Sequence, residues 1–113
     1  MMVIPLRQLH ARCDANGFLR DPSDWTTSIA SVMAEQAHLG PLKAEHWRVI
    51  SALRRRYHDT HGVPPMRQVC RELDIPEPCV TNLFHDPLTA WRIAGLPNPG
   101  EEARSYLPSS ERP

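Results

Sequence analysis

The chain has 113 residues, a length that suits one small domain and is too short for two. Its 13 basic side chains are balanced by 13 acidic ones, so the overall charge favours neither nucleic acid nor an anionic membrane as a partner. No segment approaches the roughly 20 apolar residues of a membrane-spanning helix, and the first residues lack the pattern of a secretory signal. These features predict a cytoplasmic protein in a reducing compartment, with Cys13, Cys70 and Cys79 as free thiols.

The N-terminal residues 6–19 predict a short β-hairpin. Leu9 precedes the sequence Asp-Ala-Asn-Gly at 14–17, and Phe18 follows it. The Asn-Gly pair tolerates the positive φ angles that a tight turn requires. Because two strands alone are only marginally stable, we expect this hairpin to pack against helices.

Two longer helices are predicted next. Residues 23–40 carry an apolar stripe, with Ser23 or Asp24 as the N-terminal cap and Gly40 as the left-handed end. Residues 42–62 give the strongest amphipathic pattern of the chain. Its apolar stripe consists of His46, Val49, Ile50, Leu53 and Tyr57, with Trp47 at its edge and Gly62 at its end.

Three short helices are expected after Pro64-Pro65, at residues 66–73, 78–84 and 86–95. The last stretch, 101–113, is polar and predicts a disordered tail. The predicted fold is therefore mainly α (α+β): a compact bundle of about five short helices with an N-terminal β-hairpin and a flexible C-terminal arm. Residues 1–100 form its single domain.

Residues 66–84 have the pattern of a helix-turn-helix, in which the second helix reads a DNA major groove. That second helix offers only Thr81 and Asn82 to base edges. Its flanks carry Glu77 and Asp86, which would repel phosphate. We therefore favour a compact helical corner without a DNA role and keep a DNA-binding regulator as an alternative.

Arginines give the long helix a basic face at Arg54, Arg55 and Arg56. The simpler interpretation is a solvated helix surface, and the functional one is docking to an acidic protein or an RNA. Arg67 directly follows the Pro-Pro pair, where it is poorly placed for the helix dipole. It could pair with a carboxylate, including the acidic residues at 101–102.

The cysteines and histidines do not have the spacing of a metal site, since His58 and His61 form neither an i, i+4 pair nor part of a CxxC pattern. We predict no metal and no cofactor. Cys70 lies on an apolar stripe, where a packing role is the default. Cys79 lies near a helix N-terminus, where the dipole lowers the pKa of a thiol, so it is the better candidate for a reactive thiol.

Several stretches taken together resemble the DsrC/TusE sulfur-relay proteins. They are NGFLRDPSDW, EHWRVISALRRRYHDTHGVPPMR and RIAGLPNP, which occur in the family's order between residues 14 and 100. The resemblance implies a small cytoplasmic domain with a C-terminal arm. In the family, a penultimate cysteine on that arm accepts sulfur as a persulfide and passes it to the next protein. The DsrC branch has a second cysteine upstream, in the helix before the arm.

This chain departs from the family at both cysteine positions, where it has Trp91 and Glu102. The resemblance therefore implies a non-carrier that binds a sulfurtransferase or a dissimilatory sulfite-reductase-type complex and regulates or senses it. An alternative keeps sulfur transfer and moves it to Cys79 or Cys70. The residues predicted to dock on the partner are Ile93, Ala94, Leu96 and Pro97 of the arm, with Arg67, Arg54, Arg55 and Arg56 as the electrostatic part.

Overall fold

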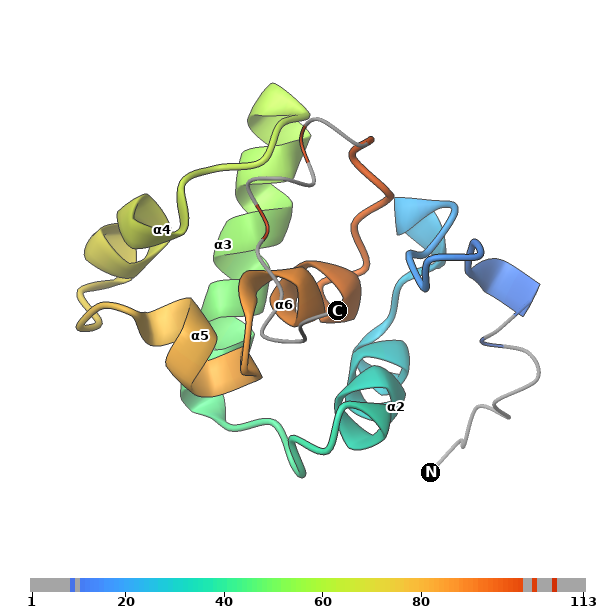
Figure 1. Ribbon diagram of the computed structural model, residues 1–113, viewed down its shortest axis with the longest axis horizontal. Coiled ribbons are helices and arrows are strands. Elements are labelled where there is room, and N and C mark those ends of the chain that lie inside the picture. The colour runs from blue at the N-terminus through green and yellow to red at the C-terminus, as the bar shows by residue number, and fades with distance from the viewer. Residues whose placement is uncertain (1–8, 10, 101–102, 104–106, 108–113) are drawn as a thin grey trace, which may run out of the picture.

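The computed structural model describes residues 9, 11–100, 103 and 107 (Figure 1). All the named secondary-structure elements among these residues are helices. Within the part of the chain that the structure describes, a short 3-10 turn precedes five named α-helices. The elements are η1 (Pro22–Asp24), α2 (Thr27–Gln36), α3 (Ala44–Thr60), α4 (Met66–Leu73), α5 (Cys79–Phe84) and α6 (Pro87–Ile93). The mainly α bundle predicted from the sequence is confirmed.

Helix α6 lies at the centre of the bundle and contacts α2, α3 and α5 (Figure 1). It begins with Pro87 in its first turn, as predicted, and Asp86 caps it by accepting a hydrogen bond from the Thr89 N–H at 2.7 Å. Helices α4 and α5 lie together on the other side of α3 from most of α2. The central place of α6 matters because the chain leaves the bundle directly after it.

Helix α3 has the strongest amphipathic pattern in the sequence, and the structure confirms it. Its buried side chains are His46, Val49, Ile50, Ala52 and Leu53. Burial of a valine, leucine or isoleucine side chain contributes about 1.5–3 kcal/mol to the stability of the fold. The opposite face carries charged side chains, and none of the described helices is long and apolar enough to cross a membrane.

Histidines, not the predicted glycines, are the first left-handed residues after α2 and α3. His38 has a φ of 62° and His61 a φ of 58°. The His61 N–H donates to the carbonyl of Tyr57, which closes the last turn of α3. Gly40 also has a positive φ, two residues beyond His38, whereas Gly62 does not. The chain therefore turns left-handed one or two residues earlier than the glycine positions indicated.

The N-terminal cap of α2 is Thr26, not Ser23 or Asp24. The Thr26 hydroxyl accepts from the Ile29 N–H at 3.1 Å. The two predicted cap residues instead belong to η1, which Asp21 caps by accepting from the Ser23 N–H. A second capping side chain upstream thus separates one expected helix into a short turn and a helix.

The predicted hairpin is reduced to a single antiparallel bridge between Cys13 and Leu19. The turn itself is present, with Gly17 at a φ of 85° and Asp14 accepting from the Phe18 N–H at 3.0 Å. Phe18 and Leu19 are consecutive and both fully buried. In a strand with one exposed face, two consecutive side chains would point to opposite faces and one of them would be exposed. The burial of both therefore shows that this segment is not a regular strand of a hairpin. Residues 6–8 and 10 of the predicted hairpin lie outside the described residues.

The structure describes two residues of the predicted tail, Ala103 and Leu107. Leu107 is 2% exposed and belongs to the hydrophobic core cluster. Leu107 falls within the predicted disordered tail, and the structure packs this residue against the body. The rest of 101–113 lies outside the described residues.

Candidate partner-binding site

The start of the C-terminal arm is held to the body by three side-chain N–H donors. They bind backbone carbonyls at the end of α6 and in the segment that follows it. The hydrogen bonds run from Trp25 Nε1 to the Ile93 carbonyl (2.9 Å), from Arg54 Nη1 to the Ala94 carbonyl (2.8 Å) and from Trp91 Nε1 to the Pro97 carbonyl (2.9 Å). We call the three donors, Trp25, Arg54 and Trp91, the arm clasp.

The arm clasp supplies donors where a helix end needs them. The last carbonyls of an α-helix have no partner within the helix, and burial without a partner is costly. Trp25 comes from the segment after η1, Arg54 from α3 and Trp91 from α6 itself. Three separate elements therefore fix the path by which the arm leaves the bundle.

Gly95 lets the arm turn beneath Trp25. Its φ is 74°, a backbone conformation that residues with a Cβ rarely adopt. A Cβ at this position would lie 2.1 Å from Cδ1 of Trp25, far inside any permitted contact. The glycine of the IAGLP sequence is thus required both by the backbone conformation and by the indole that covers it.

Arg54 is a half-buried member of the clasp, not part of a solvated basic face as the sequence indicated. Its guanidinium lies 4.2 Å from the ring centroid of Trp25, a cation–π distance, and also donates to the Pro22 carbonyl at 3.4 Å. Burial lowers the pKa of the Arg54 guanidinium. It stays charged at neutral pH, because an arginine guanidinium remains protonated far above that pH.

Arg55 and Arg56 both pair with Glu72, which ties α3 to α4. The hydrogen bond from Arg56, together with that from Arg55, holds the pKa of the Glu72 carboxyl below its usual range. Arg67 is exposed at the start of α4, and its side chain has no hydrogen bond or ion pair with any residue that the structure describes. Its suggested partners at 101–102 lie outside the described residues.

Three of the four predicted docking residues of the arm are buried. Ile93, Ala94 and Leu96 are at most 1% exposed, whereas Pro97 is half-buried. Direct contact of the first three with a partner does not fit this arrangement. They anchor the arm, and the first solvent-accessible residue after them is Pro97.

Trp91 occupies the centre of the anchor. It is fully buried in α6, and its ring meets Tyr57 of α3 edge-on, with the ring centroids 5.9 Å apart. Its one polar atom, Nε1, is satisfied by the arm itself, at Pro97. A buried indole needs such an acceptor, so the packing of α6 and the position of the arm are set by one side chain.

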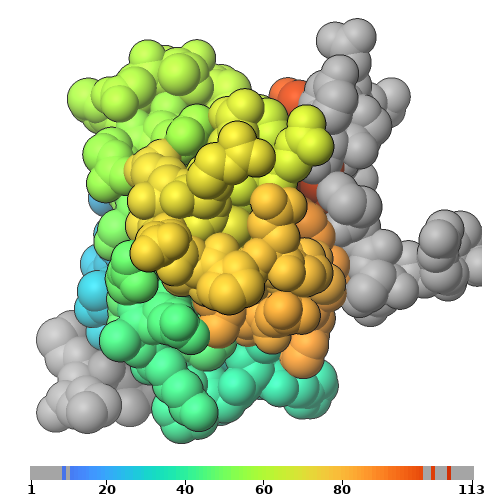
Figure 2. Space-filling model, turned by 90° about the vertical axis from the view of Figure 1, so that its left-hand side faces the viewer, coloured from blue at the N-terminus to red at the C-terminus, as the bar shows by residue number. Residues whose placement is uncertain are grey.

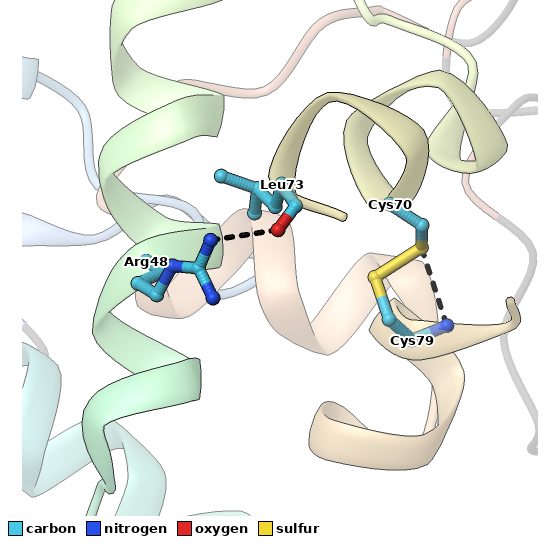
Figure 3. Close-up of a disulfide and its surroundings, with 4 residues drawn as sticks. All are labelled: Arg48, Cys70, Leu73 and Cys79. Carbon is cyan, nitrogen blue, oxygen red and sulfur yellow. Dashed lines mark hydrogen bonds between the residues drawn. A yellow bond between two sulfur atoms is a disulfide. The ribbon is translucent and has the colours of Figure 1, made fainter. Parts of the chain in front are cut away.

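Cys70 and Cys79 form a disulfide, which contradicts the prediction of free thiols (Figure 3). Their Cα atoms are 5.7 Å apart, within the normal range, and both residues are 1% exposed. The bond joins α4 to α5, while Arg48 of α3 donates to the Leu73 carbonyl at the end of α4 (2.6 Å). Neither cysteine is an exposed reactive thiol. Cys13 is free and half-buried, and burial raises the pKa of its thiol.

We expect the protein purified without reductant to show one titratable thiol after denaturation, and three after reduction. Reduction should also lower the free energy of unfolding by about 2 kcal/mol, because the short loop is no longer closed in the unfolded chain. The measurement is thiol titration combined with denaturant unfolding. In Cys13→Ser the first count should fall to zero and the gain on reduction should stay at two. Three thiols in the unreduced protein would contradict the disulfide.

His46 is a structural contact between helices that the sequence placed on the apolar stripe without a role. Its Nδ1 accepts from the Lys43 N–H at 2.9 Å, so Nε2 carries the proton and donates to the Leu83 carbonyl at 2.9 Å. The ring also meets Phe84 edge-on. The EHW sequence thereby joins α3 to the end of α5. No group of three or more metal-ligating side chains occurs among the described residues.

Helices α4 and α5 lie side by side on one face of the molecule (Figure 2). Thr81 and Asn82 are exposed there, as the helix-turn-helix interpretation requires. Helix α5 has only six residues, and the disulfide fixes it to α4. Arg67 and Arg71 are exposed on α4 in the same corner, whereas α5 itself offers no cation beside Thr81 and Asn82.

A family comparison decides the relationship of this chain. A family model described as "DsrC like protein" matches residues 6–101. The chain belongs to the DsrC-like family. The resemblance to DsrC/TusE sulfur-relay proteins seen in the sequence is thereby confirmed for nearly the whole domain.

Curated relatives and a solved structure agree with the DsrC-like assignment. The sulfurtransferase TusE of Yersinia pseudotuberculosis is 32% identical over 60 residues, which cover 53% of this chain and 55% of the relative. In that alignment the chain spans about half of the relative's length. TusE of Buchnera aphidicola from Acyrthosiphon pisum is 26% identical over 95 residues, covering 76% of this chain and 82% of the relative.

One structural neighbour is the oxidized gamma-subunit of the dissimilatory sulfite reductase, DsrC, from Archaeoglobus fulgidus. It superimposes with a TM-score of 0.68 at 32% identity and covers 80% of this chain and 90% of that one. The bundle described above is therefore a DsrC-type fold.

The arm clasp was not visible in the sequence, because Trp25 and Arg54 lie far along the chain from the carbonyls they bind.

Proposed function

We propose that this DsrC-like protein binds a sulfur-relay partner without carrying sulfur itself. The partner is a sulfurtransferase or a sulfite-reductase-type complex. One observation carries the proposal: Trp91, at the family position of the upstream cysteine, is buried and hydrogen-bonded to the arm at Pro97. Glu102 stands at the position of the penultimate cysteine. Neither side chain can hold a persulfide, because that chemistry requires a thiol.

The anchored arm supports a role in binding. With residues 93–96 held by the body, the partly exposed segment 97–100 leaves the bundle from a fixed point. A segment that is already ordered loses less conformational entropy when it binds, which favours affinity. Arg67, exposed and unpaired among the described residues, supplies a cation for an acidic partner surface.

Sulfur transfer through the other cysteines is disfavoured by their surroundings. Cys70 and Cys79 are bonded to one another and almost fully covered. A donor persulfide has no thiolate to load at this place. A regulator that occupies the docking site of a true carrier requires no thiol at all.

The test restores the missing thiol. In a Cys13→Ser background, Glu102→Cys places the only free thiol of the protein at the family's carrier position. After incubation with a persulfide-loaded sulfurtransferase from a sulfur-relay system, intact mass should show a gain of about one sulfur atom on this variant. The Cys13→Ser and Cys13→Ser/Glu102→Ser proteins should show no gain.

Competition then tests binding by the natural sequence. An excess of the unchanged protein should slow the loading of the Glu102→Cys variant, because both occupy the same site on the donor. A sulfur gain on the unchanged protein would overturn the non-carrier assignment. Loading that is unaffected by the unchanged protein would overturn the binding role.

A further inference from the structure

A pocket between α2, α6 and the N-terminal turn has features of a small-molecule site. Its volume is about 510 Å³, within the range of roughly 300–1,000 Å³ typical of ligand sites. Leu9, Met33 and Ile93 contribute apolar surface, and the turn at 14–17 forms one wall. The proposed partner-binding role does not use this pocket.

Arg92 places a cation in the pocket wall. Its side chain has no ion pair or hydrogen bond with any described residue, and its Nε is shielded from solvent and lacks an acceptor. The guanidinium carbon lies 5.2 Å from the ring centroid of Phe18, which holds the side chain in place. A guanidinium that is positioned but unpaired is the usual anchor for a carboxylate or sulfonate.

Gly17 leaves room for this cation. A Cβ at Gly17 would come within 3.4 Å of Arg92 Nε, and the φ of 85° also favours glycine. The turn therefore lies close over the guanidinium without a side chain between them. The same sequence that predicted a hairpin turn builds one side of a charged pocket.

The other titratable groups of the pocket wall are Asp14 and Cys13. Asp14 already accepts hydrogen bonds from the backbone N–H groups of Asn16 and Phe18, at 2.9 and 3.0 Å. Cys13 is a neutral thiol at neutral pH, because burial and the nearby Asp14 carboxylate raise its pKa. It adds a soft, weakly polar surface beside the apolar side chains.

We propose that this pocket binds a small organic anion, with its carboxylate or sulfonate on Arg92 and its apolar body against Leu9, Met33 and Ile93. An apolar cavity with one convergent charged group is the general pattern of such sites. Because Arg92 and Ile93 lie on α6 directly before the arm, an occupant would contact the same helix that anchors the arm.

The test uses 2-naphthoate and the neutral 2-naphthamide, which match in shape and differ in charge. Cys13 reports on occupancy, since it lines the pocket and is the one cysteine outside the disulfide. At mildly alkaline pH, naphthoate should slow the alkylation of Cys13 by iodoacetamide, and naphthamide should require a roughly tenfold higher concentration for the same effect.

Arg92→Gln should weaken the protection by naphthoate roughly tenfold and bring it to the level of naphthamide. Arg71→Gln, an exposed site on α4 outside the pocket, should leave it unchanged. Should Arg92→Gln fail to fold by circular dichroism, the comparison of the two compounds on the unchanged protein decides alone. Equal protection by both compounds, or protection by neither, would overturn the proposal.

Discussion

Replacing Gly95 with alanine should lower the free energy of unfolding by about 3 kcal/mol or more. Two effects add at this residue. The left-handed φ of 74° costs roughly 1 kcal/mol for a residue with a Cβ. The new Cβ would lie 2.1 Å from Cδ1 of Trp25 and would push the indole off the turn, which also breaks its hydrogen bond to Ile93. Denaturant unfolding followed by tryptophan fluorescence measures the loss.

Gly40→Ala is the matched control. Gly40 has nearly the same φ, 75°, and a Cβ there would have no neighbour within 4 Å. Its cost should be limited to the backbone term, roughly 1 kcal/mol. The difference between the two variants isolates the contact with Trp25. If both variants lose the same stability, the close approach of Trp25 to the turn is wrong.

The helices of this protein follow from local sequence. The bounds and buried face of α3 were predictable, because apolar residues that repeat at helical spacing must share one side. The start of α6 was predictable from Asp86-Pro87, since a capping carboxylate and a proline in the first turn both favour a helix start. These features depend on residues within a few positions of each other.

The arm clasp was not predictable in the same way. Trp25 reaches a carbonyl 68 residues away, and Arg54 reaches one 40 residues away. Arg54 belongs to a run of three arginines that looks like a solvated surface in sequence, and only the fold distinguishes it from its two neighbours. The family resemblance located the arm but gave no indication of what holds it.

The disulfide was missed for a different reason. The assignment of free thiols came from an assumed reducing compartment, and the spacing of nine residues between Cys70 and Cys79 carries no disulfide signal by itself. The turn between α4 and α5 brings the two helix faces together, and their buried cysteines meet as a result. The cellular compartment concerns the surroundings of the protein, whereas the pairing of two cysteines requires that the fold bring their Cα atoms close together.

Trp91 bears both on the non-carrier proposal and on the packing of the fold. A cysteine in its place would leave the Pro97 carbonyl without its donor and α6 without its largest buried side chain. The tryptophan therefore does more than remove a thiol. It adds a hydrogen bond between the helix and the arm, and so sets where the partly exposed segment 97–100 begins.

Replacement of Trp91 tests this anchoring. Trp91→Ala should cost about 3–5 kcal/mol, since a fully buried indole is removed from the core. That variant mixes packing with tethering, so Trp91→Phe is the more informative one. It keeps an apolar ring beside Tyr57, loses the donor to Pro97 and should cost about 1–2 kcal/mol.

Hydrogen exchange separates the two contributions. In Trp91→Phe the amides of Asn98 and Gly100 should exchange faster, because the arm is released after Leu96 while the body stays folded. Trp25→Phe loses an equivalent indole bond at Ile93, before the turn, so its effect should centre on the end of α6. Unchanged exchange at 98–100 in Trp91→Phe would mean that packing alone holds the arm. The hydrogen bond from Trp91 to Pro97 would then have no part in fixing the path of the arm.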